Sequence, residues 1–485
     1  LARAPAMAGA QLCYVALGGN LGDSLRYISR AVRRVAELDG VKLCRTSSLF
    51  RTSPQYVADQ PSFLNAVAEV ELSPGRSSDL HSLLLDFKRI EGDVGRTPGG
   101  QRRGPRIVDL DLVAVGEERL DIAGGDYPLE IPHGRMHERD FVLMPLSELC
   151  PGWRHPTRPG RPTVSEMLAS VMPPDRHSDA APGMAPQQVL PASGGLHGRA
   201  GALWNRGDKT LVMGILNVTP DSFSDGGENL QLDDAIASAQ AMVDAGAHII
   251  DIGGESTRPG AVEVPPEQEA ARVVPLVAAL RARAGFDDVT LSVDTRKSVV
   301  ARHAVEAGAD WINDVSGGGF DPEMLRTAAE LMAPIVLMHS RGTPETMNDM
   351  VRYDSLLEDV IRHLLERRRA AQEAGVPSWN IILDPGIGFA KKLEENLAIL
   401  GRCPELVEAL RPSPVLIGAS RKRFLSTILG ESDPKATVFA TAATTASATA
   451  AGVDVVRVHD VREMAQTARM SDEIFRRRIR GNFAK

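Results

Sequence analysis

The second half of the chain alternates between short apolar runs and longer segments whose apolar residues have helical spacing. The runs indicate strands because they are short and rich in Val and Ile. They are LVMGILNV (211–218), HIIDIGG (248–254), VTLSVDT (289–295), WINDVSG (311–317), PIVLMHS (334–340), IILDPGI (381–387), VLIGASR (415–421) and VVRVHD (455–460). Segments 233–245 and 355–374 are two of the predicted helices. Eight β–α repeats favour an α/β TIM barrel over the alternative, a doubly wound sheet, because nothing signals a reversal of strand order.

Three predicted helices of this half run into a glycine just before the next strand. The stretches are DAGAHIID (244–251), EAGADWIND (306–314) and AAGVDVVRV (450–458). Glycine is common directly after a helix because it adopts positive φ without a steric penalty. The pattern therefore predicts positive φ at Gly246, Gly308 and Gly452.

The first half is less regular. QLCYVALG (11–18) predicts a strand, and after a glycine-rich turn a helix begins near Asp23 or Ser24. Further apolar runs lie in SSLFRTSP (47–54), SFLNAVAEVEL (62–72) and IVDLDLV (107–113), and helices are predicted at 78–95 and 163–170. Two long helices with few strands favour an α+β fold, a ferredoxin-like α-β-α sandwich.

Between the halves lies a stretch rich in Pro, Gly and Ala that shows no periodicity, which is typical of a linker. We therefore expect a first domain at 11–175, a linker at 176–205 and a second domain at 206–485.

Composition excludes several classes of protein. The net charge of −8 argues against a general nucleic-acid binder, and no apolar run approaches the roughly 20 residues of a membrane span. Four cysteines without CxxC spacing suggest neither a zinc site nor a disulfide framework, so we expect a soluble protein in a reducing compartment. The opening LARAPAMAGA is compatible with the end of a transit peptide. The expected location is the cytoplasm, or the mitochondrial matrix if such a peptide has been lost.

Polar residues gather at the carboxyl ends of the predicted barrel strands, where TIM barrels hold their active sites. One such Asp is usually a helix N-cap, but capping alone does not explain polar residues on nearly every strand. The residues are Asn217, Asp251, Glu255, Asp294, Asn313, His339, Asp384, Ser420, Arg421, Lys422, Arg457 and His459.

GILNVTPDSFSDGG (214–227), DIGGESTRPG (251–260), LDPGIGF (383–389), IGASRKRF (417–424) and VRVHD (456–460) resemble dihydropteroate synthase, and the match covers essentially the whole second half. The resemblance implies condensation of 6-hydroxymethyl-7,8-dihydropterin diphosphate with p-aminobenzoate. It implies that Asn217 holds Mg²⁺ on the diphosphate, and that the family usually forms homodimers through the barrel. The implied pterin ligands are Asp294, Asn313, Asp384 and Lys422, and the implied diphosphate ligands are Thr257, Arg258, Arg457 and His459.

In GPRIVDLDLV (104–113), Asp109 and Asp111 share one face of a strand, about 6–7 Å apart. Such close carboxylates repel unless a cation lies between them. The preceding GRTPGGQRRGPR (95–106) contains four arginines and no acid. A solvated basic loop is one interpretation; a polyphosphate clamp beside a two-metal Mg²⁺ site is the other.

The motifs ALGGNLGD (16–23), DQPSFLNA (59–66), RRGPRIVDLDLV (102–113) and IPHGRMHERDFVL (131–143) resemble 6-hydroxymethyl-7,8-dihydropterin pyrophosphokinase. The resemblance implies diphosphate transfer from ATP to the pterin, with Asp109 and Asp111 on two Mg²⁺ ions. Two positions depart from the family: Arg103 replaces an aromatic residue, and Gly134 stands where Pro or Tyr is common. The other implied residues are Arg96 and Arg106 on the transferring phosphate, Phe63, Asn65 and Phe141 on the pterin, Arg102, His133 and Arg139 on ATP, and Lys88 and Glu91 as further candidates.

The two resemblances agree, since the first domain would make what the second consumes in folate synthesis. The expected ligands are ATP, 6-hydroxymethyl-7,8-dihydropterin and p-aminobenzoate, with neither nucleic acid nor membrane. One alternative is an active barrel with a non-catalytic first domain, against which the intact aspartate pair argues. Another is a pterin-dependent methyltransferase barrel.

Overall fold

The computed structural model describes residues 9–97, 103–124, 126–172, 185–194, 202–219, 228–256, 261–342, 346–347 and 350–479. The chain forms two compact units. The amino-terminal unit comprises Leu1–Leu190 with Pro377–Trp379, and the barrel unit comprises Pro191–Val376 with Asn380–Lys485.

An antiparallel sheet forms the centre of the amino-terminal unit. Its strand order is β5-β1-β4-β3-β8, and β2 also pairs with β4. The strands are β1 (Gln11–Gly19), β2 (Val41–Thr46), β3 (Leu49–Thr52), β4 (Phe63–Leu72), β5 (Asp109–Val115) and β8 (Gln187–Pro191). A separate hairpin consists of β6 (Leu120–Ile122) and β7 (Leu129–Ile131).

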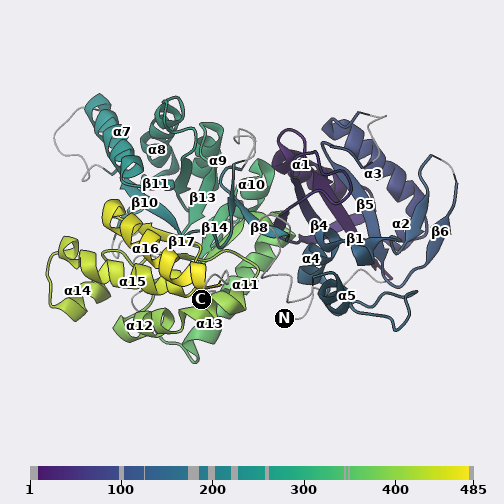
Figure 1. Cartoon of the computed structure of the whole chain (residues 1–485). Coiled ribbons are helices and arrows are strands. Elements are labelled where there is room, and N and C mark those ends of the chain that lie inside the picture. The colour runs from purple at the N-terminus through teal and green to yellow at the C-terminus, as the bar shows by residue number, and fades with distance from the viewer. Residues whose placement is uncertain are drawn as a thin grey trace. The chain divides into compact units, whose positions relative to one another are not determined.

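Helices cover both faces of this sheet. Helices α1 (Ser24–Ala36) and α3 (Leu80–Val94) lie on one side, and α4 (Asp140–Leu149) and α5 (Val164–Val171) on the other (Figure 1). The short α2 (Pro74–Ser77) and the 3-10 turn η1 (Met136–Glu138) complete the unit. Strand β1 serves both layers, because Tyr14 packs with the α4 and α5 core while its neighbours Cys13 and Val15 are buried on the opposite face. The predicted α-β-α sandwich is confirmed.

Eight parallel strands form the barrel, in the order β15-β14-β13-β12-β11-β10-β17-β16. The ring closes where the Leu383 N–H donates to the Pro414 carbonyl at 2.9 Å and Leu383 pairs with Val415. The strands are β10 (Leu211–Asn217), β11 (Ile249–Gly253), β12 (Thr290–Asp294), β13 (Trp311–Asp314), β14 (Ile335–Met338), β15 (Ile381–Asp384), β16 (Leu416–Ile417) and β17 (Val455–Val458). Each lies in a predicted run, and closure confirms the TIM barrel over the doubly wound alternative.

The barrel helices follow the strands in turn. They are α7 (Glu228–Asp244), α8 (Pro266–Arg281), α9 (Ser298–Glu306), α10 (Met324–Leu331), α11 (Leu356–Glu373), α12 (Leu393–Gly401), α13 (Cys403–Leu410), α14 (Arg423–Leu429), α15 (Val438–Ala450) and α16 (Val461–Ile479), with 3-10 turns η4 (Ser378–Asn380) and η5 (Pro434–Thr437). Gly246, Gly308 and Gly452 have φ of 105°, 115° and 87°, as the helix–Gly–strand pattern predicts. This turn geometry lets the chain enter the next strand directly.

The segment predicted as a linker is not wholly irregular. Strand β8 lies within it and pairs with β3, with Phe50 opposite Gln188 and Leu49 opposite Val189. The compact units divide at Leu190, and the short strand β9 (Leu203–Asn205) follows in the barrel unit. Sheet pairing therefore extends the amino-terminal unit beyond residue 175.

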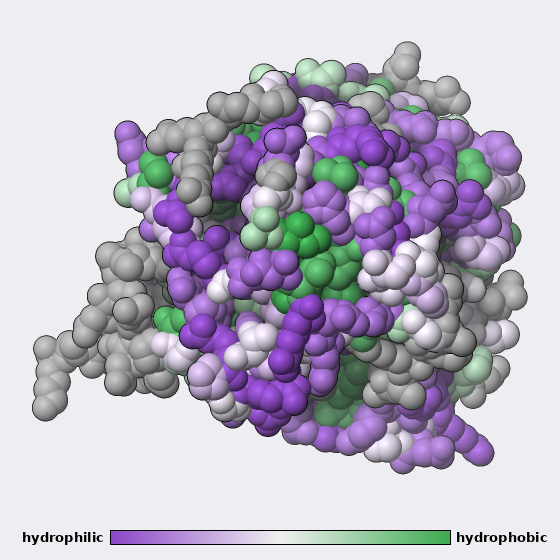
Figure 2. All heavy atoms as spheres, turned by 90° about the vertical axis from the view of Figure 1, so that its right-hand side faces the viewer, coloured by the Kyte–Doolittle hydropathy of each residue, from purple (hydrophilic) through white to green (hydrophobic). Residues whose placement is uncertain are grey.

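Figure 2 shows mostly hydrophilic residues among the coloured part of one face, and the hydrophobic residues gather mainly near its centre. In the part of the chain that the structure describes, no helix has the length and apolar character that a membrane crossing needs. Cys13, Cys44, Cys150 and Cys403 form no disulfide.

Candidate functional sites

Strand β5 separates the core of the amino-terminal unit from a cavity of about 1110 Å³. Val108, Leu110 and Leu112 are buried, whereas Asp109 and Asp111 are partly exposed and line the cavity. The period-two pattern of the strand thus turns both carboxylates towards the same open space.

Nearly all the residues predicted for the first site border this cavity. They are Phe63, Asn65, Lys88, Glu91, Arg96, Arg106, Asp109, Asp111, His133, Arg139 and Phe141. Arg102 lies outside the described residues. Residues from β4, α3, β5 and α4 therefore meet although they are far apart in sequence.

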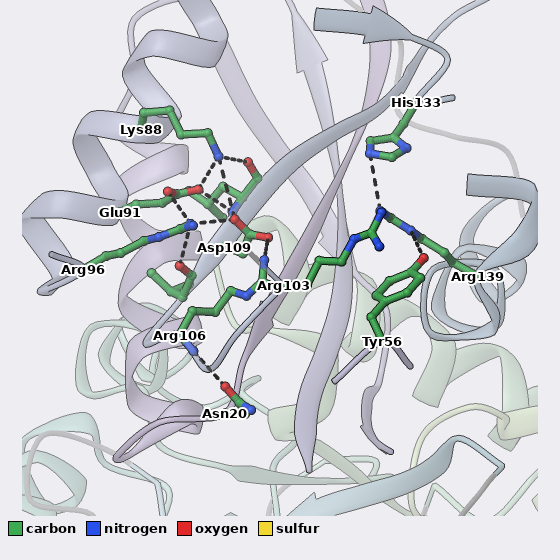
Figure 3. A network of polar contacts seen from close by, with 12 residues as sticks. Asn20, Tyr56, Lys88, Glu91, Arg96, Arg103, Arg106, Asp109, His133 and Arg139 are labelled. Carbon is green, nitrogen blue, oxygen red and sulfur yellow. Dashed lines mark hydrogen bonds and ion pairs between the residues drawn. The ribbon is translucent and has the colours of Figure 1, made fainter. Parts of the chain in front are cut away.

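Asp109 is the centre of a dense ion-pair network (Figure 3). Arg96 donates to Asp109 Oδ1 at 2.6 Å, and Arg106 donates to Oδ2 at 2.5 Å. The Lys88 ammonium lies 3.8 Å from Oδ1 and 2.6 Å from Glu91. Arg96 also donates to Glu91 at 2.6 Å. Helix α3 thus adds an acid, Glu91, and a cation, Lys88, to the network.

The pKa values of the two aspartates shift in opposite directions. Burial opposes ionisation of Asp109, but the nearby Lys88, Arg106 and Arg96 outweigh it and lower its pKa. Burial and the charge of Asp109 raise the pKa of Asp111. This repulsion is what a divalent cation bound between the carboxylates would relieve, so the residues fit Mg²⁺.

Arginines and aromatic rings line the cavity next to the aspartates. Arg139 lies over the Phe141 ring at 5.6 Å and 3.4 Å from His133 Nε2, and Arg106 lies 5.7 Å from the Phe63 ring. The Asn65 amide donates to Thr52 Oγ1 at 2.7 Å. The implied pterin ligands are thus on the wall beside the aspartates.

Tyr56 is one of several cavity residues that the sequence prediction missed. Its ring lies 4.4 Å from the Arg103 guanidinium and 4.8 Å from that of Arg135. Its hydroxyl accepts a hydrogen bond from Arg139 at 3.4 Å (Figure 3). Tyr56 occurs in an irregular polar segment, so no periodicity marks it. Only the fold brings the three arginines to it.

In the barrel, a buried charge network occupies the carboxyl ends of neighbouring strands. Arg457 donates from Nε to Asp251 and from a terminal nitrogen to Asp294, each at 2.6 Å. The Asn313 amide donates to the same Asp251 oxygen at 2.9 Å. Asp251, which had no ligand role in the sequence prediction, is completely buried and brings these residues together.

Asp384 and Lys422 lie in the same barrel mouth. One oxygen of Asp384 accepts the Gly386 N–H at 2.7 Å. Burial raises the pKa of Asp384 to about 6 and that of Asp294 to about 7. The Lys422 ammonium lies 4.1 Å from the centre of the Phe389 ring, a position that the sequence reasoning did not assign.

The buried side chain of Lys391 holds the loop after Asp384 in place. Lys391 is buried and lies 2.9 Å from His339 Nδ1 and 3.0 Å from the carbonyls of Gly386 and Phe389. Burial lowers the pKa of Lys391 to about 7. Its contacts with these two carbonyls fix the backbone between Asp384 and Phe389.

The remaining predicted barrel residues differ in how far the structure describes them. Asn217 is the last residue of β10 and is partly exposed. Its Oδ1 and the Asp294 side chain both lie next to Gly253, at 3.6 and 3.5 Å from the place a Cβ would take there. His459 lies 3.1 Å from Ser420 Oγ. Thr257 and Arg258 lie outside the described residues. The preceding Glu255 is buried and paired with Arg296 at 2.9 Å and with Lys297.

Comparisons with known proteins match both units. The family model of 7,8-dihydro-6-hydroxymethylpterin-pyrophosphokinase matches residues 14–151, and that of pterin binding enzyme matches residues 213–459. The mitochondrial folate synthesis bifunctional protein of Pisum sativum is 39% identical, over 96% of this chain and 89% of the relative. The corresponding mitochondrial protein of Arabidopsis thaliana is 38% identical, over 96% and 83%.

Solved structures agree with this division. The HPPK-DHPS of Plasmodium falciparum, solved with pteroate, has a TM-score of 0.77 over 96% of this chain and 97% of that one, at 20% identity. The dihydropteroate synthase of Xanthomonas albilineans, solved with 4-aminobenzoic acid, is 39% identical, with a TM-score of 0.53 over 59% of this chain and 98% of that one. This chain belongs to the bifunctional folate synthesis enzymes, which transfer diphosphate from ATP to 6-hydroxymethyl-7,8-dihydropterin and condense the product with p-aminobenzoate to 7,8-dihydropteroate.

Proposed function

We propose that the cavity beside β5 carries out the diphosphate transfer and that Asp109 and Asp111 hold Mg²⁺ there. The observation that carries this proposal is the pair of carboxylates facing one cavity beside Lys88, Arg96 and Arg106. Bound Mg²⁺ supplies charge neutralisation for the ATP phosphates.

The protein residues have separate roles in this transfer. The pterin hydroxyl attacks the β-phosphorus of ATP, the bond to the α-phosphate oxygen breaks, and AMP leaves. Arg96 and Arg106 turn from Asp109 to the transferring phosphates, for which a planar guanidinium is well shaped. Phe63 and Phe141 hold the pterin ring and Asn65 its polar edge, while His133, Arg139 and Arg102 bind the nucleotide.

For the barrel we propose that Asp294, Asn313, Asp384 and Lys422 bind the pterin edge. Its N–H groups need carboxylate acceptors, and the buried acids need donors. Arg457, His459, Thr257 and Arg258 surround the diphosphate, with Asn217 on its Mg²⁺. The arylamine attacks the pterin methylene carbon, the C–O bond breaks and diphosphate leaves, so no protein nucleophile takes part. Removing negative charge from the leaving group lowers this barrier.

We further propose that the barrel forms homodimers through α14 and α15. Large apolar side chains are exposed there: Phe439 is 88% exposed, Ile428 51% and Leu429 48%. Apolar surface of this kind is usually covered by a partner.

For the location, the mitochondrial names of plant relatives support the matrix, and the cytoplasm is the alternative. We retain the proposal of separate domains at 11–175 and 206–485 joined by 176–205, with β8 as an addition to the first.

Asp109→Asn and Asp111→Asn should each lower AMP formation from ATP and the pterin alcohol by at least about a hundredfold, because each removes a metal ligand. Condensation of preformed pterin diphosphate with p-aminobenzoate should stay at the wild-type rate. Asp93→Asn is the control, since Asp93 pairs with Arg34 on the surface. Near-normal AMP release from either cavity variant would remove the basis for the metal site.

Arg457→Ala should weaken binding of the pterin diphosphate ester far more than binding of the alcohol, because only the ester carries the anion. Losing a charged partner in a desolvated site costs on the order of 2–5 kcal/mol, which calorimetry resolves. Lys422→Ala should weaken both ligands alike. Arg457→Ala leaves two buried carboxylates without a cation and can destabilise the fold. The same comparison is therefore also made between the double variant Arg457→Ala/Asp294→Asn and the single variant Asp294→Asn, because the double variant has one buried charge fewer. Equal loss for ester and alcohol would contradict the diphosphate role.

The affinity of the barrel for the pterin alcohol should fall as the pH drops below about 7. The pterin N–H donors need ionised carboxylates, and the pKa is raised to about 7 for Asp294 and to about 6 for Asp384, so binding must expel protons at lower pH. Each such group gives at most about a tenfold loss per pH unit. Calorimetry in two buffers of different ionisation enthalpy measures the proton release. Affinity that rises on acidification would show that the protonated acid is the binding form.

Phe439→Lys should convert the homodimer to a monomer, because it places a charge in the apolar interface. Light scattering after gel filtration gives the mass directly. Lys435→Ala, in the adjoining turn η5, is the control and should leave the mass unchanged. A dimer that persists with Phe439→Lys would exclude this surface.

A further inference from the structure

Tyr56 joins three arginines that come from separate parts of the amino-terminal unit. Arg103 precedes β5, Arg135 lies in the turn after β7, and Arg139 precedes α4. Two stack on the ring and the third donates to the hydroxyl, at the distances given above. All four residues line the cavity that contains Asp109 and Asp111. Figure 3 shows Tyr56, Arg103 and Arg139 on the same side, across from the Asp109 network.

The charge around Tyr56 is only partly compensated, since Arg139 interacts electrostatically with Asp111 and Glu138 without pairing directly with either. Within the described part of the chain, Arg103 and Arg139 form no ion pair with a carboxylate, and Arg135 pairs with the exposed Glu138 at 3.0 Å. Three neighbouring guanidinium groups repel one another. An aromatic ring attracts a guanidinium without adding a negative charge. Tyr56 can therefore hold these cations in place while leaving their charge available to an anion, which a carboxylate at this position could not do.

Two backbone positions beside this ring are constrained. Arg103 has a left-handed φ of 64°. A Cβ built on Gly134 would lie 2.0 Å from Glu130 Oε2, so a larger side chain there requires Glu130 to move. Tyr56 contacts Arg103 and also Arg135, the residue after Gly134.

We propose that Tyr56 is the positioning residue of the nucleotide-phosphate site, holding Arg103, Arg135 and Arg139 towards the ATP phosphates. The cations lie opposite the aspartates, so a polyphosphate between the two walls would contact metal on one side and guanidinium groups on the other. This inference rests on the diphosphate-transfer activity of the first unit.

The test uses the full chain with Mg²⁺ and α,β-methylene-ATP as the probe, measured by calorimetry, together with steady-state KM values. Tyr56→Ala should raise the Kd of the probe and the KM for ATP roughly tenfold, since two cation–π contacts and a hydrogen bond are lost. The KM for the pterin alcohol should change less than twofold. Tyr56→Phe retains the stack and should stay within about threefold of wild type.

Two further variants separate positioning from loop stability. Val57→Ala truncates the adjacent residue, which does not line the cavity, and should bind the probe as wild type does. Tyr56→Glu can pair with the arginines but neutralises them, so it should bind the probe at least as weakly as Tyr56→Ala. Wild-type binding by Tyr56→Glu, or a Tyr56→Ala Kd within twofold of Val57→Ala, would overturn the inference. AMP release by the wild-type chain tests the diphosphate-transfer activity separately. If the wild-type chain is active, either overturning result contradicts the positioning role of Tyr56 and leaves the proposed activity intact.

Discussion

Both sites depend on buried or partly buried carboxylates that need a positive partner. Each site lies where strands direct acids into a confined space, Asp109 and Asp111 in the cavity and Asp251 and Asp294 in the barrel mouth. Leaving a buried charge unpaired is costly, so each group of acids is matched by basic side chains within the same unit. Arg96 and Arg106 do this for Asp109, and Arg457 for the barrel acids. With the ligand roles proposed above, binding at either site would exchange one partner of these charged groups for another, which would limit its net energetic cost.

The fold was largely predictable because it is built from repeated local patterns. The apolar runs of the barrel, the glycines after three helices and the alternation along β5 each have one physical meaning, and the structure agrees with them. The residues that border the cavity were also identifiable, since Asp109, Arg96 and His133 occur in motifs with fixed spacing. A short stretch of sequence carries this information because the spacing of apolar residues within one helix or strand depends on that element alone.

Other features depend on tertiary contacts that no local pattern contains. Strand β8 lies in a stretch that reads as a linker, and its partner β3 is far away in sequence. Tyr56 stands in an irregular segment, and the arginines around it come from three places. Arg457 was predicted as a diphosphate ligand from its motif, but its pairing with Asp251 and Asp294 is a property of three strand ends brought together by barrel closure.

The same pairing links the two chemical steps. In the unliganded barrel Arg457 occupies an oxygen of Asp294, which on our assignment is needed by the pterin. A pterin alcohol carries no charge that could draw the guanidinium away, whereas the diphosphate ester brings an anion for which a forked guanidinium is well suited. If Asp294 and Arg457 have the roles proposed above, the group added in the first reaction frees Asp294 for the second. Discrimination between alcohol and ester would then follow from competition for one arginine.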